Sequence, residues 1–345
     1  MTDIATIGEF GLIDRLTRNI RIEQPSTILG CGDDAAVIAY PIGQHTVVST
    51  DLLLEGIHFD LTYTPIKHLG YKAAVVNFSD IAAMNARPRQ IVVSIGLSSR
   101  FGLEQVDELY EGLRAACASY KVDLVGGDTT ASLNGLTISI TCIGEVEPRK
   151  LTKRSGAKPT DLICVSGNLG AAYMGLQLLE REKAVFESME KTDYFQPAFE
   201  GREYLVERQL KPEARTDIVE LLERENILPT SMIDISDGLS SELLHIAHSS
   251  KVGVRIYEER IPIDYQTALM AEEFNFNVVT AALNGGEDYE LLFTAPLSMA
   301  DKLQRLSDVH LIGHITESNL GCAMVSRDQQ EITLQAQGWQ AYSQQ

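Results

Sequence analysis

Cysteine is scarce in this sequence, and its spacing argues against two common uses of it. The 345 residues include five cysteines, and none of them forms a CxxC pair or joins a cysteine–histidine cluster. An odd number of scattered cysteines, mostly in apolar runs, is typical of reduced, buried thiols. We therefore expect no zinc site and a reducing, cytoplasmic location. The cysteines are Cys31, Cys117, Cys142, Cys164 and Cys322.

Long apolar runs and nucleotide-binding P-loops are also missing. No run of about 18 apolar residues occurs, so we expect no membrane-spanning helix. The first residues carry neither a basic region nor an apolar one, so we expect no signal peptide. No glycine-rich loop ends in Gly-Lys-Ser or Gly-Lys-Thr, which argues against the P-loop class of protein.

Basic residues are much less common than acidic ones. The chain has 29 Lys and Arg against 48 Asp and Glu, a net charge of -19 at pH 7. Nonspecific nucleic-acid binding needs a basic face, so this balance argues against it, and against an anionic membrane surface as well. An acidic protein still binds a phosphorylated substrate when metal ions reverse the local charge.

Length and composition indicate two ordinary globular domains. The chain exceeds the commonest single-domain size, and 44% of its residues are hydrophobic, enough for a sizeable core. The most basic stretch, residues 147–159, marks a change in composition, and we place the domains at 1–150 and 151–345. Within this stretch, Arg154 fits a solvated linker and an anion-binding site equally well.

Apolar periodicity predicts a mixture of helices and strands, which favours an α/β or α+β fold. We expect helices over 8–16, 66–79, 104–120 and 239–247, with a short turn or helix over 80–86. We expect strands over 35–38, 46–49, 90–97, 136–141, 162–167 and 311–315. The glycines at 167 and 170 suggest a weak phosphate loop, but we interpret them as close strand–helix packing.

Acidic residues follow apolar runs at five places, which are Asp34, Asp51, Asp80, Asp128 and Asp237. If these runs are strands whose ends converge, their carboxylates meet in one cleft and repel one another. Mg²⁺ prefers oxygen ligands and usually binds one or two carboxylates together with substrate phosphates. The repetition therefore predicts a magnesium and phosphate site. The alternative for Asp80 and Asp237 is helix N-capping, because both precede helix-like segments.

The chemistry that suits these residues is phosphoryl transfer. No Ser-His-Asp or Cys-His set is evident, so we predict no protein nucleophile. Phosphoryl transfer requires mainly that two phosphates are held in line and their charge is neutralised. An acceptor phosphate has a second pKa of about 6 and needs no catalytic base near neutral pH. We interpret His245 and His248 as structural.

Seven motifs follow one another in the order of one family. The sequence resembles the thiamine-monophosphate kinases, of the superfamily that contains aminoimidazole ribonucleotide synthetase and selenophosphate synthetase. The resemblance covers about residues 8–339. The motifs are Gly32-Asp33-Asp34, Ser49-Thr50-Asp51 with Glu55-Gly56-Ile57-His58-Phe59, residues 77–84, Gly126-Gly127-Asp128-Thr129-Thr130, residues 151–156, Asp234-Ile235-Ser236-Asp237-Gly238-Leu239 and residues 285–291.

The resemblance implies an activity and an architecture. The activity is direct, in-line transfer of the ATP γ-phosphate to thiamine monophosphate, giving thiamine diphosphate in the last step of its biosynthesis. The transfer is assisted by several Mg²⁺ ions. The architecture is a homodimer of two-domain chains. A mixed N-terminal sheet with helices forms a barrel across the dimer, and the C-terminal domain is an α/β sandwich.

The resemblance also implies roles for individual residues. The metal ligands would be Asp34, Ser49, Thr50, Asp51, Asp80, Asp128, Asp234 and Asp237. ATP would contact Tyr110, Gly127, Asp128, Arg154 and Ser236. Thiamine monophosphate would contact His58, Glu287 and Trp339, whose indole would stack on the thiazole or the pyrimidine ring. Such stacking is reasonable cation–π chemistry, because the thiazolium is positively charged. This chain departs from the family after Trp339, where Gln340-Ala341-Tyr342 replaces the usual His-Phe.

Two other functions remain open. One is a different ATP-dependent reaction of the same superfamily, such as amidine-ring closure. The other is a nucleotide or metal sensor without turnover. Selenophosphate synthesis would need a reactive cysteine, but no basic residue adjoins Cys31, which we interpret as a packing residue.

Overall fold

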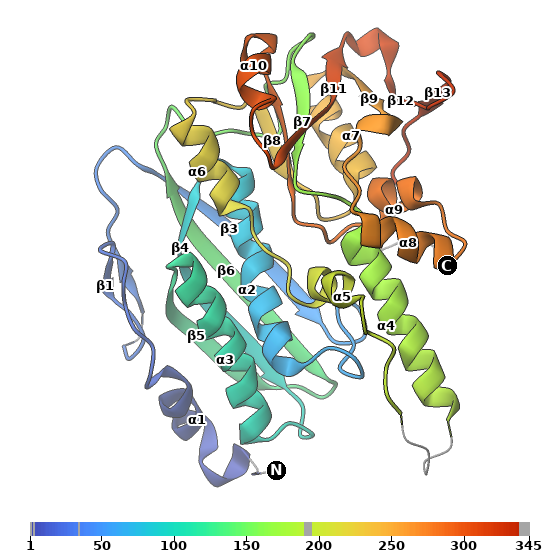
Figure 1. Ribbon diagram of the computed structural model, residues 1–345. Coiled ribbons are helices and arrows are strands. Elements are labelled where there is room, and N and C mark those ends of the chain that lie inside the picture. The colour runs from blue at the N-terminus through green and yellow to red at the C-terminus, as the bar shows by residue number, and fades with distance from the viewer. Residues whose placement is uncertain (1, 3, 34, 190–194, 338–345) are drawn as a thin grey trace. The chain divides into compact units, whose positions relative to one another are not determined.

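The computed structural model describes residues 2, 4–33, 35–189 and 195–337 (Figure 1). The chain forms two compact units. Met1–Ile81 and Ala86–Leu151 make up the first, called here the N-terminal unit. Ala82–Asn85 and Thr152–Gln345 make up the second, the C-terminal unit. Each unit is described by itself.

A four-stranded sheet is the scaffold of the N-terminal unit. Its strand order is β3-β6-β4-β5, so β3 and β5 are the two edge strands. β4 and β5 run parallel, and the other neighbours are antiparallel. The strands are β3 (His45–Leu54), β4 (Arg87–Leu97), β5 (Asp123–Ala131) and β6 (Leu136–Val146). A separate pair, β1 (Thr27–Leu29) and β2 (Val37–Ile38), follows helix α1 (Gly8–Thr17).

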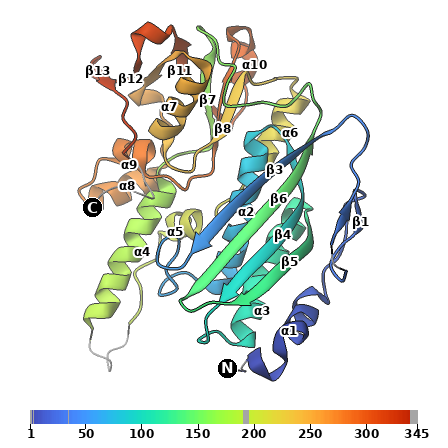
Figure 2. The ribbon, with the colours of Figure 1, turned by 180° about the vertical axis from the view of Figure 1, so that it is seen from behind.

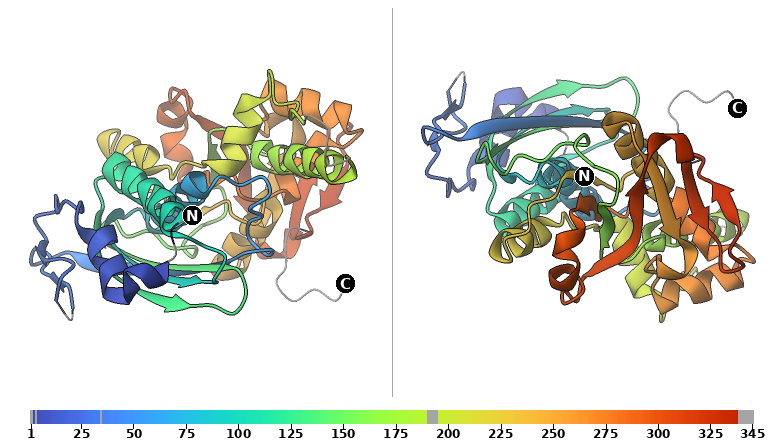
Figure 3. Two further views of the ribbon diagram at one scale, coloured as in Figure 1. Left: turned by 90° about the horizontal axis from the view of Figure 1, so that it is seen from below. Right: turned by 90° about the horizontal axis from the view of Figure 1, so that it is seen from above.

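Two helices cover one face of this sheet. They are α2 (Ile66–Ala83) and α3 (Leu103–Tyr120), and the edge-on views in Figure 3 show them on the same side of the strands. The burial of β6 alternates residue by residue along all of its length, as expected for a strand with one buried face. Among the described residues of the unit, no helix lies over the opposite face (Figure 2).

Helices α2 and α3 pack closely enough for their backbones to touch. A Cβ added at Gly112 would lie 1.9 Å from the carbonyl oxygen of Lys67, and one at Gly70 would lie 2.0 Å from that of Leu109. A side chain at either position would therefore push the helices apart. The same interface holds the rings of Phe78 and Tyr120 at a centroid separation of 5.2 Å.

We expect Gly112→Ala to lower the free energy of unfolding by at least 1–3 kcal/mol, the usual cost of overpacking. The obstacle is main chain, which cannot move aside like a flexible side chain. Urea unfolding measures the effect. Gly126→Ala is the control, because a Cβ there meets no atom within 4 Å. Equal loss of stability in the two variants would contradict the packing argument.

The N-terminal unit corrects part of the predicted arrangement of acids. Asp51 and Asp128 lie within strands β3 and β5 rather than after them, because both strands stay hydrogen-bonded beyond these residues. Asp80 lies in helix α2, which continues to Ala83 instead of ending at residue 79. Its position inside the helix excludes the N-capping alternative for Asp80. The idea that these three acids end strands is therefore wrong.

A seven-stranded sheet is the scaffold of the C-terminal unit, with the strand order β13-β12-β9-β11-β7-β10-β8. All neighbouring strands are antiparallel except β9 and β12. The strands are β7 (Leu162–Ser166), β8 (Ser231–Asp234), β9 (Gly253–Tyr257), β10 (Leu291–Ala295), β11 (Val309–Thr316), β12 (Cys322–Val325) and β13 (Glu331–Thr333).

Helices cover both faces of this sheet, which makes the unit an α/β sandwich. Alternate residues of β7 belong to different cores: Ile163 and Val165 pack with α7, and Cys164 packs with α6 and α10. Such two-sided burial explains why β7 and β10 are apolar without alternation. The helices are α4 (Ala171–Ser188), α5 (Glu203–Leu210), α6 (Thr216–Arg224), α7 (Leu239–Ser250), α8 (Tyr265–Glu273), α9 (Val278–Asn284) and α10 (Ala300–Leu303).

The fold is therefore a mixed α/β architecture, as the sequence predicts. The predicted helices over 8–16, 104–120 and 239–247 agree with α1, α3 and α7 within a few residues. Helices α4, α5, α8 and α9 share a small core of their own around Met174 and Leu205. Within the described ranges, no helix is both long and apolar enough to cross a membrane.

Candidate active site

Three of the predicted metal ligands meet in the N-terminal unit. Ser49 and Asp51 belong to the row of β3 that pairs with buried residues of β6, so both lie on the face covered by helices. Asp80 reaches the same place from α2, where its carboxylate accepts a hydrogen bond from the Ser49 hydroxyl. A strand and a helix thus bring two carboxylates and one hydroxyl together.

The surroundings of Asp51 oppose its negative charge. Burial, the larger effect, and the neighbouring charge of Asp80 together raise the pKa of Asp51 from 3.8 to about 6. A partly buried carboxylate beside another carboxylate is stabilised by a bound cation. This electrostatic demand is what a divalent metal ion would satisfy.

Two other predicted ligands lie on the opposite face of the sheet. Thr50 alternates with Ser49 and Asp51, and its hydroxyl contacts that of Thr141 at 3.1 Å. Asp128 pairs with Ser94 of β4, and both lie on the face of the sheet opposite to Asp51. Three inter-strand spacings of ~4.8 Å separate the edge strands, about 14 Å in all. Asp51 and Asp128 of one chain are therefore not neighbours.

Within the described parts of the chain, no three His, Cys, Asp or Glu side chains gather in a group that could hold a metal ion. The pair Asp51 and Asp80 thus supplies two carboxylates and needs further oxygen ligands. Mg²⁺ commonly takes these from water and substrate phosphates. Asp34, the remaining predicted ligand of this unit, lies outside the described residues.

The other predicted contacts of the N-terminal unit differ in exposure. The His58 ring accepts a hydrogen bond at Nδ1 from the backbone N–H of Leu54, at 3.0 Å. Neutral His58 therefore carries its proton on Nε2 and offers a donor there. Tyr110 is buried on α3, and this burial raises the pKa of its hydroxyl. Gly127 lies on the exposed edge strand β5.

In the C-terminal unit, the loop after β8 and the loop before β10 are joined. The N–H of Glu287 donates to the carbonyl of Ser236 at 2.7 Å, and the N–H of Tyr289 donates to that of Ile235 at 2.9 Å. The N–H of Ile235 in turn donates to the carbonyl of Glu290 at 2.8 Å. Two segments that are more than 50 residues apart in the sequence therefore form one surface.

The loop before β10 adopts an unusual backbone. Glu287 and Tyr289 have φ values of 58° and 52°, the left-handed region that L-residues other than Asn and Asp rarely adopt. Gly286 precedes them with φ 72°, and a Cβ there would lie 2.6 Å from the carbonyl oxygen of Ser236. The surrounding contacts must hold this strained conformation in place.

Charged side chains converge on Asp237. Burial raises the pKa of its carboxyl, whereas the charges of His245 and Arg154 lower it and that of Glu287 raises it. All three side chains therefore lie close enough to Asp237 to act on it. Arg154 is exposed, and its role stays a prediction. No side chain caps helix α7, so capping does not explain Asp237 either.

Glu242 of α7 lies beneath this loop. Its Oε1 accepts hydrogen bonds from the backbone N–H groups of Asp237, at 2.9 Å, and of Ser236, at 3.3 Å. Burial, with a smaller effect from the charges of Asp237 and Asp234, raises the pKa of Glu242 to about 8. The buried Asp234 ends strand β8 nearby. Asp234, Ser236, Asp237 and Glu287 thus share one corner of the unit.

The contacts of Asp288 decide between the phosphate-loop and the close-packing interpretations of the glycines at the start of α4. Its carboxylate accepts hydrogen bonds from the N–H groups of Gly170, at 2.7 Å, and Ala172, at 3.3 Å. The first turn of α4 is therefore occupied by a buried side chain. Gly167 and Gly170 serve close packing, because added Cβ atoms would meet Glu290 and Ala282.

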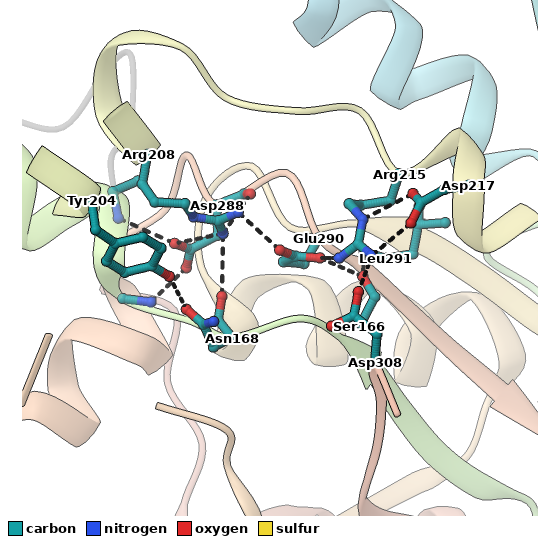
Figure 4. A network of polar contacts seen from close by, with 12 residues as sticks. Ser166, Asn168, Tyr204, Arg208, Arg215, Asp217, Asp288, Glu290, Leu291 and Asp308 are labelled. Atoms are coloured by element: carbon teal, nitrogen blue, oxygen red, sulfur yellow. Dashed lines mark hydrogen bonds and ion pairs between the residues drawn. The ribbon is translucent and has the colours of Figure 1, made fainter. Parts of the chain in front are cut away.

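A buried ionic network stabilises the loop before β10 (Figure 4). Arg208 of α5 donates to Glu290 Oε1 at 3.0 Å and to the carbonyl of Asp288 at 3.1 Å. Arg215 pairs with the other oxygen of Glu290, which also accepts from Ser166 at 2.6 Å. Two arginines thus neutralise the carboxylates that follow Glu287.

The C-terminal unit also has a cavity of about 480 Å³ beside α9. Helix α9, strand β13 and the segment that follows it line the cavity, including Thr280, Asn284 and Gln337. The N–H of Gln337 donates to Asn284 Oδ1 at 3.2 Å, which ties this last segment to α9. Trp339 lies two residues further on, outside the described residues.

Comparison with known proteins identifies the family. The domain family "AIR synthase related protein, N-terminal domain" matches residues 32–146. Thiamine-monophosphate kinase of Bacillus subtilis (strain 168) is 34% identical over 338 residues, which is 96% of this chain and 99% of the relative. This chain belongs to the thiamine-monophosphate kinase family.

Solved structures of this family share the fold. The thiamine-monophosphate kinase of Stenotrophomonas maltophilia K279a has a TM-score of 0.78 and 31% identity, covering 92% of this chain and 96% of its own. AaThiL complexed with AMPPCP and TMP has a TM-score of 0.73 and 32% identity, covering 99% of both chains. The latter protein therefore binds an ATP analogue and thiamine monophosphate together.

Several residues that form this part of the family fold escape prediction from the sequence. Glu242 and His245 follow Asp237 at five and eight residues, positions whose spacing on α7 was a usable signal. Arg208 and Gln209 gave no usable signal in the sequence, because they lie about 80 residues before the loop that they contact. Only the fold brings them there.

Proposed function

We propose that this chain phosphorylates thiamine monophosphate with ATP, giving thiamine diphosphate and ADP. One observation carries the proposal: Asp51 and Asp80 lie together in a chain that aligns over 99% of its length with a protein bound to AMPPCP and TMP. The paired carboxylates suit metal-assisted phosphoryl transfer, and the relative supplies the acceptor.

The residues of the N-terminal unit would position the nucleotide phosphates. We assign Ser49, Asp51 and Asp80 to Mg²⁺, since hydroxyl and carboxylate oxygens are the ligands that this ion prefers. Bound Mg²⁺ would neutralise phosphate charge during transfer. Asp34, Thr50, Asp128, Asp234 and Asp237 remain proposed ligands, and Tyr110, Gly127, Arg154 and Ser236 remain proposed ATP contacts.

The residues assigned to the acceptor supply binding and orientation rather than proton transfer. His58 offers an N–H donor, and Glu287 offers a carboxylate to the cationic part of thiamine. The cavity that Asn284 helps to line has room for a ring system, and Asn284 precedes Glu287 by three residues in the sequence. No residue is assigned as a base, because the acceptor phosphate is already largely ionised near neutral pH.

A product assay tests the proposal. Purified protein is incubated with ATP, Mg²⁺ and thiamine monophosphate, and the products are separated by chromatography. We expect one thiamine diphosphate for each ADP, and no product from unphosphorylated thiamine, which lacks the acceptor phosphate. Folded protein that forms no thiamine diphosphate would reject the proposal.

We also propose that the protein is a cytoplasmic homodimer. The uncovered face of the N-terminal sheet exposes Val48 and Leu52 at 61% and 52%. Two such sheets closing edge to edge into a barrel would bury this face. β5 of one copy would then run beside β3 of the other. This arrangement would place the strand that carries Asp128 in one chain next to the strand that carries Asp51 in the second.

Mixed dimers test this arrangement. Asp51→Asn and Asp128→Asn should each be inactive alone. If the two carboxylates act together across the dimer, co-expressed variants should recover about a quarter of wild-type activity, since half the dimers are mixed and one of their two sites is intact. Activity that stays at the level of the separate variants would contradict a shared site.

A further inference from the structure

Gln209 contacts the residue that the family resemblance assigns to the substrate. Its Nε2 donates a hydrogen bond to Glu287 Oε2 at 2.6 Å. Gln209 lies near the end of α5 and is 5% exposed, so its amide is largely shielded from solvent. We propose that Gln209 is a positioning residue that fixes the direction of the Glu287 carboxylate toward thiamine monophosphate.

The backbone at Glu287 explains why the carboxylate requires such support. A left-handed conformation is strained for a residue other than glycine and persists only when its surroundings enforce it. The main-chain bond to Ser236 fixes the Glu287 backbone on one side. It does not fix the side chain, whose rotamers remain to be restricted by a contact such as that from Gln209.

Helix α5 is itself held firmly, so Gln209 is a fixed reference point. The adjacent Arg208 donates to the carbonyls of Asn168 and Asp288 and pairs with Glu290, as Figure 4 shows. Leu205 and Leu210 of the same helix are buried. The helix therefore fixes the loop backbone through Arg208 and the Glu287 side chain through Gln209.

The chemical type of Gln209 suits this role. A lysine or arginine at this position would orient Glu287 equally well but would neutralise its charge. A neutral amide donor leaves the carboxylate negative and able to attract the cationic thiazolium or a ring amino group. This inference rests on the proposed function, because it takes Glu287 as a contact of thiamine monophosphate.

The test is a double-mutant cycle that combines Gln209→Leu with Glu287→Gln. Leucine is close to glutamine in size and removes the donor. The readouts are the dissociation constant of thiamine monophosphate in the presence of AMPPCP and Mg²⁺, by calorimetry, and the KM values in turnover. We expect Gln209→Leu to weaken binding of thiamine monophosphate about tenfold, the loss of one hydrogen bond to a charged group. The KM for ATP should stay within about twofold.

The double variant decides between positioning and a merely structural role. If Gln209 acts through Glu287, the double variant binds thiamine monophosphate no more weakly than Glu287→Gln alone. Multiplied effects, or equal increases in both KM values, would overturn the inference. Gln177→Leu on α4 is the matched control and should leave both constants unchanged. If Gln209→Leu does not fold, Gln209→Met replaces it in the same cycle.

Failure of the inference differs from failure of the proposed function. Wild-type protein that makes no thiamine diphosphate rejects the function. Active wild-type protein in which Glu287→Gln matters but Gln209→Leu adds to it independently rejects only the role of Gln209. An active Glu287→Gln variant with unchanged binding also overturns the inference, because Gln209 then has no contact to position.

Discussion

Asp51→Asn should lower kcat by at least about 10³-fold, the effect of losing about 4 kcal/mol of transition-state stabilisation. The asparagine keeps the size of the side chain but removes the negative charge that a metal ion would need. Phosphate release from the nucleotide and thiamine diphosphate formation both measure the loss. Asp14→Asn, in an exposed pair with Arg18, is the control and should retain full activity.

The same variant should be more stable than wild type when metal is absent. The pKa of Asp51 is raised to about 6 in the folded protein from 3.8, so its ionisation opposes folding. The protonated Asp51 carboxyl contributes fully to stability below pH 3.8, and this contribution is lost as pH rises through about 6. The ionised carboxyl then lowers the free energy of unfolding by up to about 2–3 kcal/mol. In metal-free buffer Asp51→Asn should melt above wild type at pH 8 and alongside it at pH 3.5. A variant that melts below wild type at pH 8 would contradict this electrostatic account.

Arg208→Leu should lower the free energy of unfolding by about 3–5 kcal/mol, the typical result of removing one partner from a buried ion pair. Its side chain is largely buried and pairs with Glu290 while binding two backbone carbonyls. Removal leaves acceptors without donors and the carboxylates of Asp288 and Glu290 with less positive charge. Chemical denaturation, monitored by circular dichroism, measures the loss.

Arg202→Leu provides the comparison for Arg208. Arg202 immediately precedes α5 and pairs with Glu273, whose side chain is 42% exposed. Pairs that solvent reaches are worth ~1 kcal/mol or less. We therefore expect a small change for Arg202→Leu and a large one for Arg208→Leu. Similar losses in both would mean that the network around Glu290 contributes no more than a surface pair.

The family and the positions of most acids were readable from the sequence because they depend on short motifs. Seven motifs in order carry the resemblance, and the longest of them covers only residues 49–59. Apolar periodicity also placed helices α1, α3 and α7 within a few residues. Such local signals survive without knowledge of the tertiary fold.

The spatial arrangement of those acids could not be predicted from the sequence, because it depends on the register of the strands. The apolar run 74–79 has the composition of a buried strand, yet it forms the buried part of α2 and carries Asp80 toward β3. Side chains alternate along β3 and across its neighbours, so the register decides which face each acid occupies. It separates Asp128 from Asp51, although both follow apolar runs in the same way.

Contacts between distant segments were the other limit. The loop before β10 reads as a glycine pair followed by acids, and nothing near it indicates a partner. Asp288 and Glu290 bind groups of α4, α5 and the segment before α6, while Gln209 contacts Glu287. These partners lie roughly 75–125 residues away in sequence. Only packing of the C-terminal unit assembles them.

The central claim is that carboxylates of this chain hold divalent ions against phosphate. Crystals grown with AMPPCP, thiamine monophosphate and Mn²⁺ in place of Mg²⁺ test it by anomalous diffraction. We predict at least one manganese peak about 2.1 Å from carboxylate oxygens of Asp51 or Asp80 that also contacts a nucleotide phosphate. Nucleotide bound with manganese at other residues, and no peak beside Asp51 or Asp80, would contradict the account.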